Sequence, residues 1–565
     1  MKAHRNAGVI LNAYPDSVGG RLGDMTALLQ RGELENCFRS FYILPSVFNT
    51  DLDRGFSLID YELDRTMAAP EDLHTLQHLG IDLYMDFICN HISVLSKQFQ
   101  DIVKNGDASP YRDFFIDWNK FWAGHGEMTP EGYIRPDPAA IEGMFFRKPG
   151  LPLLMVRFPD GRDVPYWNTF YQEVRYRVPD AVELVSALGM QYGEAAAVSA
   201  LCEKAIGAGQ KPAEIDFGPC GQWKAAVTDY LEAHRSYLGQ MDLNIRSPLV
   251  MDYYRETLEK LASYRCSVIR LDAFAYTSKL VGRHNFLNEP ETWDLLKAID
   301  GIATPLGLEL LPEIHADYAT GTYRVLAEKG YLVYDFFLPG LLIDAMRRGS
   351  GELLARWGRE LVRDGIRTVN MLGCHDGIPL LDLKGLLPEE DIQAVIDTVV
   401  GRGGYVKDLH GAKNMYYQVN ATYFSALGED VRRMLLARAV QLFMPGRPQV
   451  WYLDLFAGTN DYEAVRRAGA GGHKEINRTN LTLDDALSRL DTPVVRDQLA
   501  LLRLRNSDPV FTEDAAISLI PSGSELEIRW ENENGTALLR ADFADCSFTV
   551  LVTDPKGAER FRFVQ

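Results

Sequence analysis

Four segments of this chain run from apolar residues, typical of buried strands, into acidic or amide-bearing residues. They are LYMDFICNH (83–91), SVIRLDAFAY (267–276), LELLPEIH (308–315) and TVNMLGCHDG (368–377). A carboxylate without a partner rarely stays in an apolar place unless it has a function. Three carboxylates brought by three strands therefore indicate one shared site. Carboxylate pairs of this kind carry out glycosidic chemistry.

Strand-like and helix-like segments alternate over most of the chain. A helix is expected at 70–80, ended by Gly80, and another at 248–264. Strands are expected at 8–14, 40–48, 83–91, 268–273, 308–314, 333–337, 368–372 and 448–453. About eight strands that alternate with helices predict a (β/α)8 TIM barrel, an α/β fold, built from residues 1–93 and 245–507.

The alternation breaks in three places. Residues 94–244 are rich in aromatic residues, proline and glycine, and we expect a large inserted domain B there, after the third strand, with a helical extension near 176–241. A second, smaller B′-like insertion is expected at about 379–425. From residue 508 on, short runs of alternating polarity separated by turn residues predict a C-terminal antiparallel β-domain, 508–565.

Composition excludes several classes of partner. A formal net charge of −19 argues against nucleic acid and anionic membrane surfaces. No apolar run approaches the roughly 20 residues that cross a bilayer, and the N-terminal segment lacks the apolar core of a signal peptide. Seven scattered cysteines without a CxxC pair predict a reducing, cytoplasmic location and no structural zinc site.

The residues around each carboxylate suggest its role. Arg270 and Asp272 are two positions apart in a strand, so their side chains share one face. We expect the arginine to lower the pKa of Asp272 and to keep it ionised, as a nucleophile must be. Glu313 follows an apolar strand, where desolvation would raise its pKa and favour a protonated general acid. Asp376, beside His375, supplies a third carboxylate near the sugar hydroxyls.

Each residue also has a structural interpretation. Arg270 and Asp272 alone could form an ion pair, and Glu313 alone could cap a helix or join a salt bridge. His91 could be a core histidine and Phe56 a core aromatic residue. Their occurrence together at strand ends, in this order, favours the catalytic interpretation.

The order D-x3-NH, R-x-D, strand-terminal E and HD resembles glycoside hydrolase family 13, the α-amylase superfamily. Asp86 and His91 fall in the first motif, and His375 and Asp376 in the fourth. The resemblance implies a retaining mechanism in which Asp272 is the nucleophile, Glu313 the general acid and base, and Asp376 the stabiliser of the transition state.

Further segments resemble the sucrose phosphorylase branch of that family. They are RGFSLIDY (54–61), RKPGLP (147–152), YYQVNATYFSALG (416–428) and INRTNLT (476–482). The resemblance implies that Asp53 and Phe56 hold the glucosyl ring and that Tyr417, Gln418 and Arg478 contact the acceptor side. Lys148 stands where the branch has a phosphate-contacting arginine, and Met415 where it has an acidic residue.

The resemblance therefore implies a phosphorylase that converts sucrose and phosphate into α-glucose 1-phosphate and fructose, without metal or other cofactor. Sucrose 6′-phosphate, glucosylglycerol and glucosylglycerate are alternative substrates. An α-glucosidase or transglucosidase of the superfamily is a second hypothesis. A silent binding or scaffold protein is a third, which the presence of all three acids argues against. We expect only small-molecule partners, and formation of a homodimer stays open.

Overall fold

The computed structural model describes residues 8–144, 146, 150–408, 416–469 and 472–565. The chain divides into two compact units. The first contains Met1–Asn90, Asp252–Ser278 and Leu287–Gln565, and the second contains His91–Met251 and Lys279–Phe286. Each unit is described separately below.

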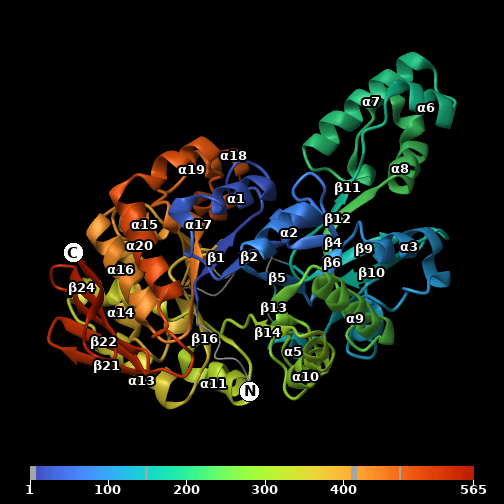
Figure 1. Cartoon of the computed structure of the whole chain (residues 1–565). Coiled ribbons are helices and arrows are strands. Elements are labelled where there is room, and N and C mark those ends of the chain that lie inside the picture. Colours follow the sequence, from blue (N-terminus) through green and yellow to red (C-terminus); the bar gives the residue numbers. More distant parts are fainter. Residues whose placement is uncertain (1–7, 145, 147–149, 409–415, 470–471) are drawn as a thin grey trace. The chain divides into compact units, whose positions relative to one another are not determined.

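The first unit is built on an eight-stranded parallel sheet that forms a nearly closed barrel (Figure 1). Its strands are β1 (Ile10–Ala13), β2 (Ser40–Ile43), β5 (Asp82–Ile88), β13 (Cys266–Asp272), β14 (Glu309–Pro312), β15 (Val333–Asp335), β16 (Thr368–Met371) and β20 (Arg447–Trp451). On one side of β1 the sheet continues through β2, β5 and β13 to β14, in the order of the chain. On the other side it continues through β20 and β16 to β15, in the reverse order. The predicted (β/α)8 barrel is confirmed.

Helices connect the barrel strands. They include α1 (Leu22–Leu29), α2 (Pro70–His78), α9 (Pro248–Ser263), α10 (Glu291–Ala303), α11 (Thr322–Glu328), α12 (Leu338–Arg348), α13 (Glu352–Arg363), α16 (Val431–Phe443), α19 (Leu483–Leu490) and α20 (Pro493–Ser507). The barrel strands are almost wholly buried, because helices cover one face of a parallel sheet and side chains fill the other. This double burial explains why the strands are nearly continuous apolar runs in the sequence.

Two predicted elements differ from the structure. The strand expected at 40–48 ends at Ile43, because Pro45 has no N–H to donate and begins the short 3₁₀ helix η2 (Pro45–Val47). The irregular stretch expected at 379–425 contains a helix, α14 (Glu389–Gly401), together with β18 (Tyr405–Asp408) and β19 (Tyr416–Asn420). Val395, Ile396 and Val399 of α14 are buried at helical spacing.

The C-terminal strands form a five-stranded antiparallel sheet in chain order (Figure 1, red). They are β21 (Ala516–Ser522), β22 (Glu525–Asn532), β23 (Gly535–Asp542), β24 (Ser547–Thr553) and β25 (Glu559–Val564). Along β23 buried and less buried residues alternate, as expected for a sheet with one covered face. The sheet contacts α13 and α16, where the Trp530 indole N–H donates to the Phe443 carbonyl oxygen at 2.7 Å.

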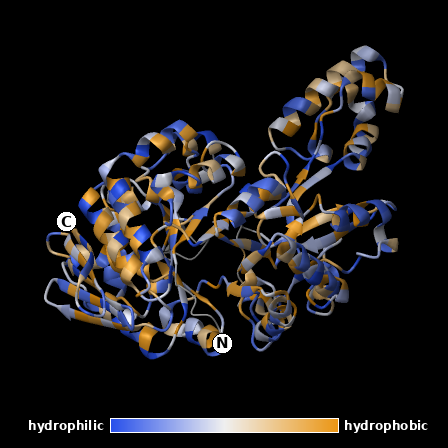
Figure 2. Cartoon of the chain, in the orientation of Figure 1, coloured by the Kyte–Doolittle hydropathy of each residue, from blue (hydrophilic) through white to orange (hydrophobic). Residues whose placement is uncertain are grey.

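The second unit is the large insertion that follows the third barrel strand, β5. Its strands include β6 (His91–Ser93), β9 (Leu153–Arg157), β10 (Asp163–Trp167), β11 (Gln172–Arg175) and β12 (Ser236–Asp242). A helical segment of α6 (Ala181–Leu188), α7 (Tyr192–Gly207) and α8 (Lys224–Ala233) projects between β11 and β12. Hydrophobic and hydrophilic residues are interspersed along these helices (Figure 2). We propose the domain boundaries at 93/94, 244/245 and 507/508 for this arrangement.

No helix among the described residues is both long enough and apolar enough to cross a bilayer.

The helical segment of the second unit has its own small core. Leu184 of α6 is fully buried in it, together with Val198, Val227 and Leu231. We predict that Leu184→Ala lowers the free energy of unfolding of this segment by about 2–5 kcal/mol, since the change removes buried methyl groups and leaves a cavity. Hydrogen exchange of the α6 and α7 amides, recorded during a urea titration, measures this free energy of unfolding. Val182→Ala, on the exposed side of α6, is the control, and equal effects of the two changes would contradict the described core.

Candidate active site

One guanidinium gathers three carboxylates from three neighbouring barrel strands. Arg270 of β13 lies opposite Asp86 of β5 in the sheet, and Glu313 directly follows β14. Arg270 Nη1 lies 2.5 Å from Asp86 Oδ1 and 2.8 Å from Asp272 Oδ1. Its Nη2 lies 2.5 Å from Glu313 Oε1. Strand register, combined with the two-residue alternation of side chains, therefore assembles the cluster at the carboxyl ends of the strands.

This cluster is almost closed to solvent. The exposed fractions of the side chains are 5% for Arg270, 0% for Asp86, 11% for Asp272 and 13% for Glu313. The Tyr42 hydroxyl donates to Asp86 at 2.9 Å. Burial raises the pKa of Asp86 to about 6, against the opposing effect of Arg270. Three buried carboxylates thus compete for one permanent positive charge, and together they favour uptake of a proton.

The electrostatics reverse the expectation drawn from the sequence. Burial raises the pKa of Asp272 well above its usual value; Arg270 opposes this effect, and the charges of Glu313 and Asp86 add to it. Burial also acts to raise the pKa of Glu313, but Arg270 and His315 outweigh it and lower that pKa to about 2. The prediction was wrong because Arg270 also reaches Glu313, and because His315 borders that carboxylate where an apolar wall was expected.

His315 connects Glu313 to a fourth carboxylate. Its Nε2 lies 3.6 Å from Glu313 Oε1, and its Nδ1 lies 3.3 Å from Asp382 Oδ2. The ring stacks on Phe336 with a centroid distance of 4.0 Å. Burial favours the neutral imidazole, but Asp382 and Glu313 prevail and raise the pKa of His315 to about 10. In the free site this ring is therefore a cation at neutral pH.

A second cluster surrounds Asp376. His375 Nε2 lies 3.1 Å from Asp376 Oδ2, and the Lys474 ammonium contacts the other carboxylate oxygen. Arg478 Nη2 lies 3.7 Å from Asp376 Oδ1, and Arg478 Nε donates to the His375 carbonyl oxygen at 2.8 Å. Burial opposes ionisation of Asp376, but His375, Lys474 and Arg478 hold its pKa well below the usual range.

A strained turn places Phe56 against this cluster. Asp53, Arg54 and Gly55 have φ values of 53°, 51° and 110°. A Cβ at Gly55 would lie 2.2 Å from the Ser46 nitrogen, so only glycine fits there. The Phe56 ring stacks on His375 at a centroid distance of 4.9 Å and an interplanar angle of 11°. Backbone strain of this kind is common where a binding site must be held in place.

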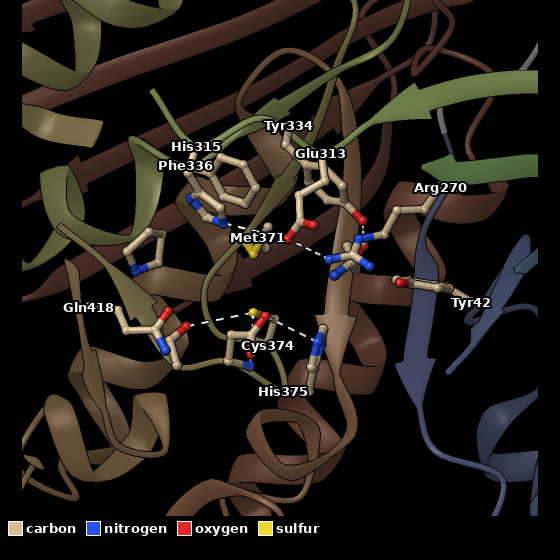
Figure 3. A pocket seen from close by; sticks show the side chains of 14 residues that line it. Tyr42, Arg270, Glu313, His315, Tyr334, Phe336, Met371, Cys374, His375 and Gln418 are labelled. Atoms are coloured by element: carbon tan, nitrogen blue, oxygen red, sulfur yellow. Dashed lines mark hydrogen bonds and ion pairs between the residues drawn. The ribbon is translucent and has the colours of Figure 1, made fainter. Parts of the chain in front are cut away.

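The clusters border one pocket (Figure 3). The predicted site residues that line it are Arg270, Glu313, His375, Asp376 and Gln418. In Figure 3 the Glu313 and His315 side chains lie side by side, Arg270 is next to Glu313, and Gln418 comes from a separate strand, β19. A pocket on which carboxylates with perturbed pKa values converge has the features of an active site.

Comparison with known proteins identifies the family. No model of a protein family matches the chain. The chain is 50% identical to the sucrose 6(F)-phosphate phosphorylase of Ilumatobacter coccineus, covering 97% of this chain and 96% of that one. It is 30% identical to the sucrose phosphorylase of Streptococcus mutans, covering 96% of this chain and 97% of the relative.

The structural comparison agrees. The crystal structure of sucrose 6F-phosphate phosphorylase from Thermoanaerobacter thermosaccharolyticum superposes with a TM-score of 0.81 at 29% identity, covering 100% of this chain and 99% of that one. The chain belongs to the sucrose phosphorylase-like branch of glycoside hydrolase family 13. The α-amylase from H. orenii, with a TM-score of 0.59 at 13% identity over 97% of this chain and 92% of that one, shares the fold.

Not every site residue predicted for this phosphorylase branch falls in the pocket. Arg478 contacts Asp376, and the charge of Asp53 acts on it, so it lies with the residues expected to hold the glucosyl ring. His91 belongs to the second unit. It lies opposite Asp242 in the antiparallel pair of strands β6 and β12, and its ring contacts Phe170. Its role stays a prediction.

Three positions expected on the acceptor side fall outside the described part of the structure, wholly or for their side chains. Tyr417 lies in β19, but its side chain is outside the described part of the structure. Lys148 and Met415 lie outside the described residues.

Sequence reasoning missed Tyr42, His315, Asp382 and Lys474. His315 had a signal, since it lies two residues beyond Glu313 and thus follows the same strand end. Lys474 and Asp382 had none, because each meets its partner only through the folding of a distant segment.

The potential metal ligands argue against a bound cation. Among the described residues, Cys374, His375 and Asp376 are the one group of this kind whose donor atoms lie within 4.8 Å of one another. The Lys474 ammonium already contacts the Asp376 carboxylate, and a metal ion there would meet a like charge.

We predict that Arg270→Lys lowers kcat/KM for release of 4-nitrophenol from its α-glucoside by at least about 100-fold. An ammonium is a point charge and cannot contact three carboxylates in the fixed geometry of the guanidinium fork. Arg367→Lys, a half-exposed arginine paired with Glu309 in the same unit, is the matched control. A loss confined to thermal stability, with full activity of the folded variant, would contradict the role given to Arg270.

Proposed function

We propose that this protein is a retaining phosphorylase that cleaves sucrose 6F-phosphate with inorganic phosphate, giving α-glucose 1-phosphate and fructose 6-phosphate. The observation that carries the proposal is the 50% identity to the sucrose 6(F)-phosphate phosphorylase of Ilumatobacter coccineus over 97% of this chain. The carboxylate cluster on Arg270 supplies the groups that the reaction needs.

The retaining course follows from the spacing of Asp272 and Glu313. Both carboxylates contact the two ends of one guanidinium, at 2.8 Å and 2.5 Å. Such neighbours fit the roughly 5–5.5 Å separation of retaining glycosidases better than the wider separation that admits a water molecule in inverting ones. Asp272 attacks the anomeric carbon, the bond to the leaving oxygen breaks, and a β-glucosyl ester forms.

The reaction requires that the proton shared within the cluster lies on Glu313. In the free site Glu313 is the ionised partner and the pKa of Asp272 is raised. A leaving-group oxygen placed against Glu313 accepts a hydrogen bond only from the protonated acid, and thus favours that form. The Arg270 contact then favours ionised Asp272, which is the state of a nucleophile.

The second cluster fits the glucosyl ring. His375 Nδ1 and Arg478 Nη2 are buried and have no hydrogen-bond partner among the described residues. Buried polar atoms of this kind are costly unless a ligand satisfies them, and the hydroxyl groups of a sugar can both donate and accept hydrogen bonds. We propose that Asp53, Phe56, Asp376 and Arg478 hold the ring while Asp272 attacks it.

The acceptor side favours an anionic leaving group. Where the branch has an acidic residue before the Tyr417–Gln418 pair, this chain has Met415, which removes a negative charge that would repel a phosphate group. Lys148 replaces an arginine and can contact phosphate as a point charge. The change at Met415 supports a phosphorylated fructose as the leaving group, and Lys148 keeps the positive charge of the arginine that it replaces.

We also propose that the enzyme works in a reducing compartment, the cytoplasm. All seven cysteines are free thiols. Formation of a homodimer stays open.

The substrate is tested with a coupled assay for glucose 1-phosphate. We expect phosphate-dependent product from sucrose 6F-phosphate, with kcat/KM at least about tenfold above that for sucrose, since one good charged contact contributes about 1.4 kcal/mol or more. A preference for sucrose would assign the protein to the unphosphorylated substrate. Free glucose formed at the same rate without phosphate would show a hydrolase instead.

The catalytic roles predict opposite substrate profiles for two variants. Asp272→Asn is expected to lose about 10⁴-fold in kcat on every glucosyl donor, because the nucleophile is gone. Glu313→Gln is expected to lose turnover of sucrose 6F-phosphate but to keep glucosyl transfer from α-glucosyl fluoride, whose leaving group needs no proton. Glu309→Gln, at the other end of β14, is the matched control. Normal activity of Asp272→Asn would refute the assignment of the nucleophile.

A further inference from the structure

We propose that His315, held by Asp382, is a positioning residue that stores the proton of Glu313 and carries it between the two half-reactions. This inference rests on the proposed function. It assigns roles to His315 and Asp382, and it gives Glu313 a proton source that the free site otherwise lacks.

The geometry places the three groups in a line. Asp382 Oδ2 lies 3.3 Å from His315 Nδ1, and His315 Nε2 lies 3.6 Å from Glu313 Oε1. One nitrogen of the ring therefore faces the carboxylate that holds it, and the other faces the general acid (Figure 3 shows the second contact). The ion pair with Glu313 becomes a hydrogen bond when the two atoms approach to about 2.8 Å.

The surroundings fix the ring in this orientation. The aromatic face of Phe336 stacks on it at 4.0 Å, which also favours a cation over the ring face. Asp382 lies in the 3₁₀ helix η10 (Leu381–Leu383), and its side chain is 2% exposed. His315 is the one cationic side chain within ion-pair distance of Asp382 among the described residues. A carboxylate so deeply buried requires a charged or donating partner, so Asp382 keeps a proton on His315.

The charged groups around His315 act in the same direction. Asp382 from η10 and Glu313 from the end of β14 both favour the imidazolium, and together they raise its pKa to about 10. Arg270 from β13 faces Glu313 from the other side and competes with His315 for that carboxylate. Asp376 acts on Glu313 with the opposite sign and favours its protonation. Glu313 thus lies between two cations, of which only His315 can give up a proton.

The proton movements balance over the reaction. In the first half, the N–H bond at Nε2 of His315 breaks, its electron pair stays on nitrogen, and the proton passes to Glu313. Glu313 gives it to the leaving oxygen as the glycosidic bond breaks and the bond to Asp272 forms. In the second half, dihydrogen phosphate gives a proton back to Glu313 and on to His315. The resulting dianion attacks the anomeric carbon and displaces the Asp272 carboxylate.

Two simpler roles are distinguished by Asp382, whose side chain is 2% exposed and contacts the ring nitrogen Nδ1, while Nε2 is the nitrogen that faces Glu313. If His315 only contacts the leaving group, loss of the Asp382 charge changes KM but not the pH profile. If Asp382 only supports the fold, its loss affects all donors equally. If His315 stores the proton, loss of the Asp382 charge lowers kcat most for the donors whose leaving group most needs a proton.

The test is the pH profile of glucosyl transfer by wild type and Asp382→Asn, with phenyl α-glucoside, 4-nitrophenyl α-glucoside and α-glucosyl fluoride as donors. Removing the Asp382 charge lowers the pKa of His315, so His315 loses its proton at lower pH. We expect the alkaline limb of kcat for phenyl α-glucoside to move down by about one pH unit or more. We expect kcat for that donor to fall at least tenfold, and kcat for the fluoride to change less than threefold. Asp317→Asn, two residues beyond His315, is the matched control.

An unchanged alkaline limb, or equal losses on all three donors, would overturn the proposal. These donors report on glucosyl transfer alone, so they remain informative if wild type makes no glucose 1-phosphate from sucrose 6F-phosphate and the proposed function fails. Should Asp382→Asn not fold, His315→Gln is measured with the same donors, and ¹⁵N NMR of wild type at pH 8 is expected to show a protonated His315. A neutral ring at that pH would also overturn the proposal.

Discussion

The active site depends on the Arg270 guanidinium, which holds three carboxylates that would otherwise repel one another in a buried place. Removal of such charges from water is favourable only when each gains close partners. The barrel brings such partners together, because neighbouring parallel strands end at the same edge. Side chains alternate between the two faces of each strand, so residues in register point to the same face. The fold and the chemistry are thus linked through the register of β5, β13 and β14.

The sequence predicts the barrel and the carboxylates at its strand ends, because both depend on local patterns. Continuous apolar runs mark strands buried on two faces, and the polar residues after them mark strand ends. Prediction from the sequence fails where distant segments of the chain meet. The protonation order of Asp272 and Glu313 reversed because three carboxylates share one arginine and because His315 reaches Asp382 from another loop. Lys474 could not be assigned to Asp376, since 98 positions separate them in the chain.

The two clusters divide the work of the pocket. In the proposed mechanism, Arg270, Glu313 and His315 control charge and protonation where the glycosidic bond breaks. His375, whose ring stacks on Phe56, and the neighbouring Asp376 form a polar surface suited to hydroxyl groups. Since the net charge of the first cluster changes during the reaction while the second stays fixed, the same ring position can serve both half-reactions. Substrate specificity commonly depends on loops, and loops carry the least information in a single sequence.

The central claim is that Asp272 forms a covalent glucosyl ester. It is tested most directly by incubating wild type with 5-fluoro-α-glucosyl fluoride, which slows breakdown of the ester, and by mapping the adduct with mass spectrometry of the digested protein. The account predicts one fluoroglucosyl group on the peptide that contains Asp272, attached to that carboxylate. An adduct on Asp86 or Glu313, or the absence of any adduct while the fluoride is consumed, would contradict it.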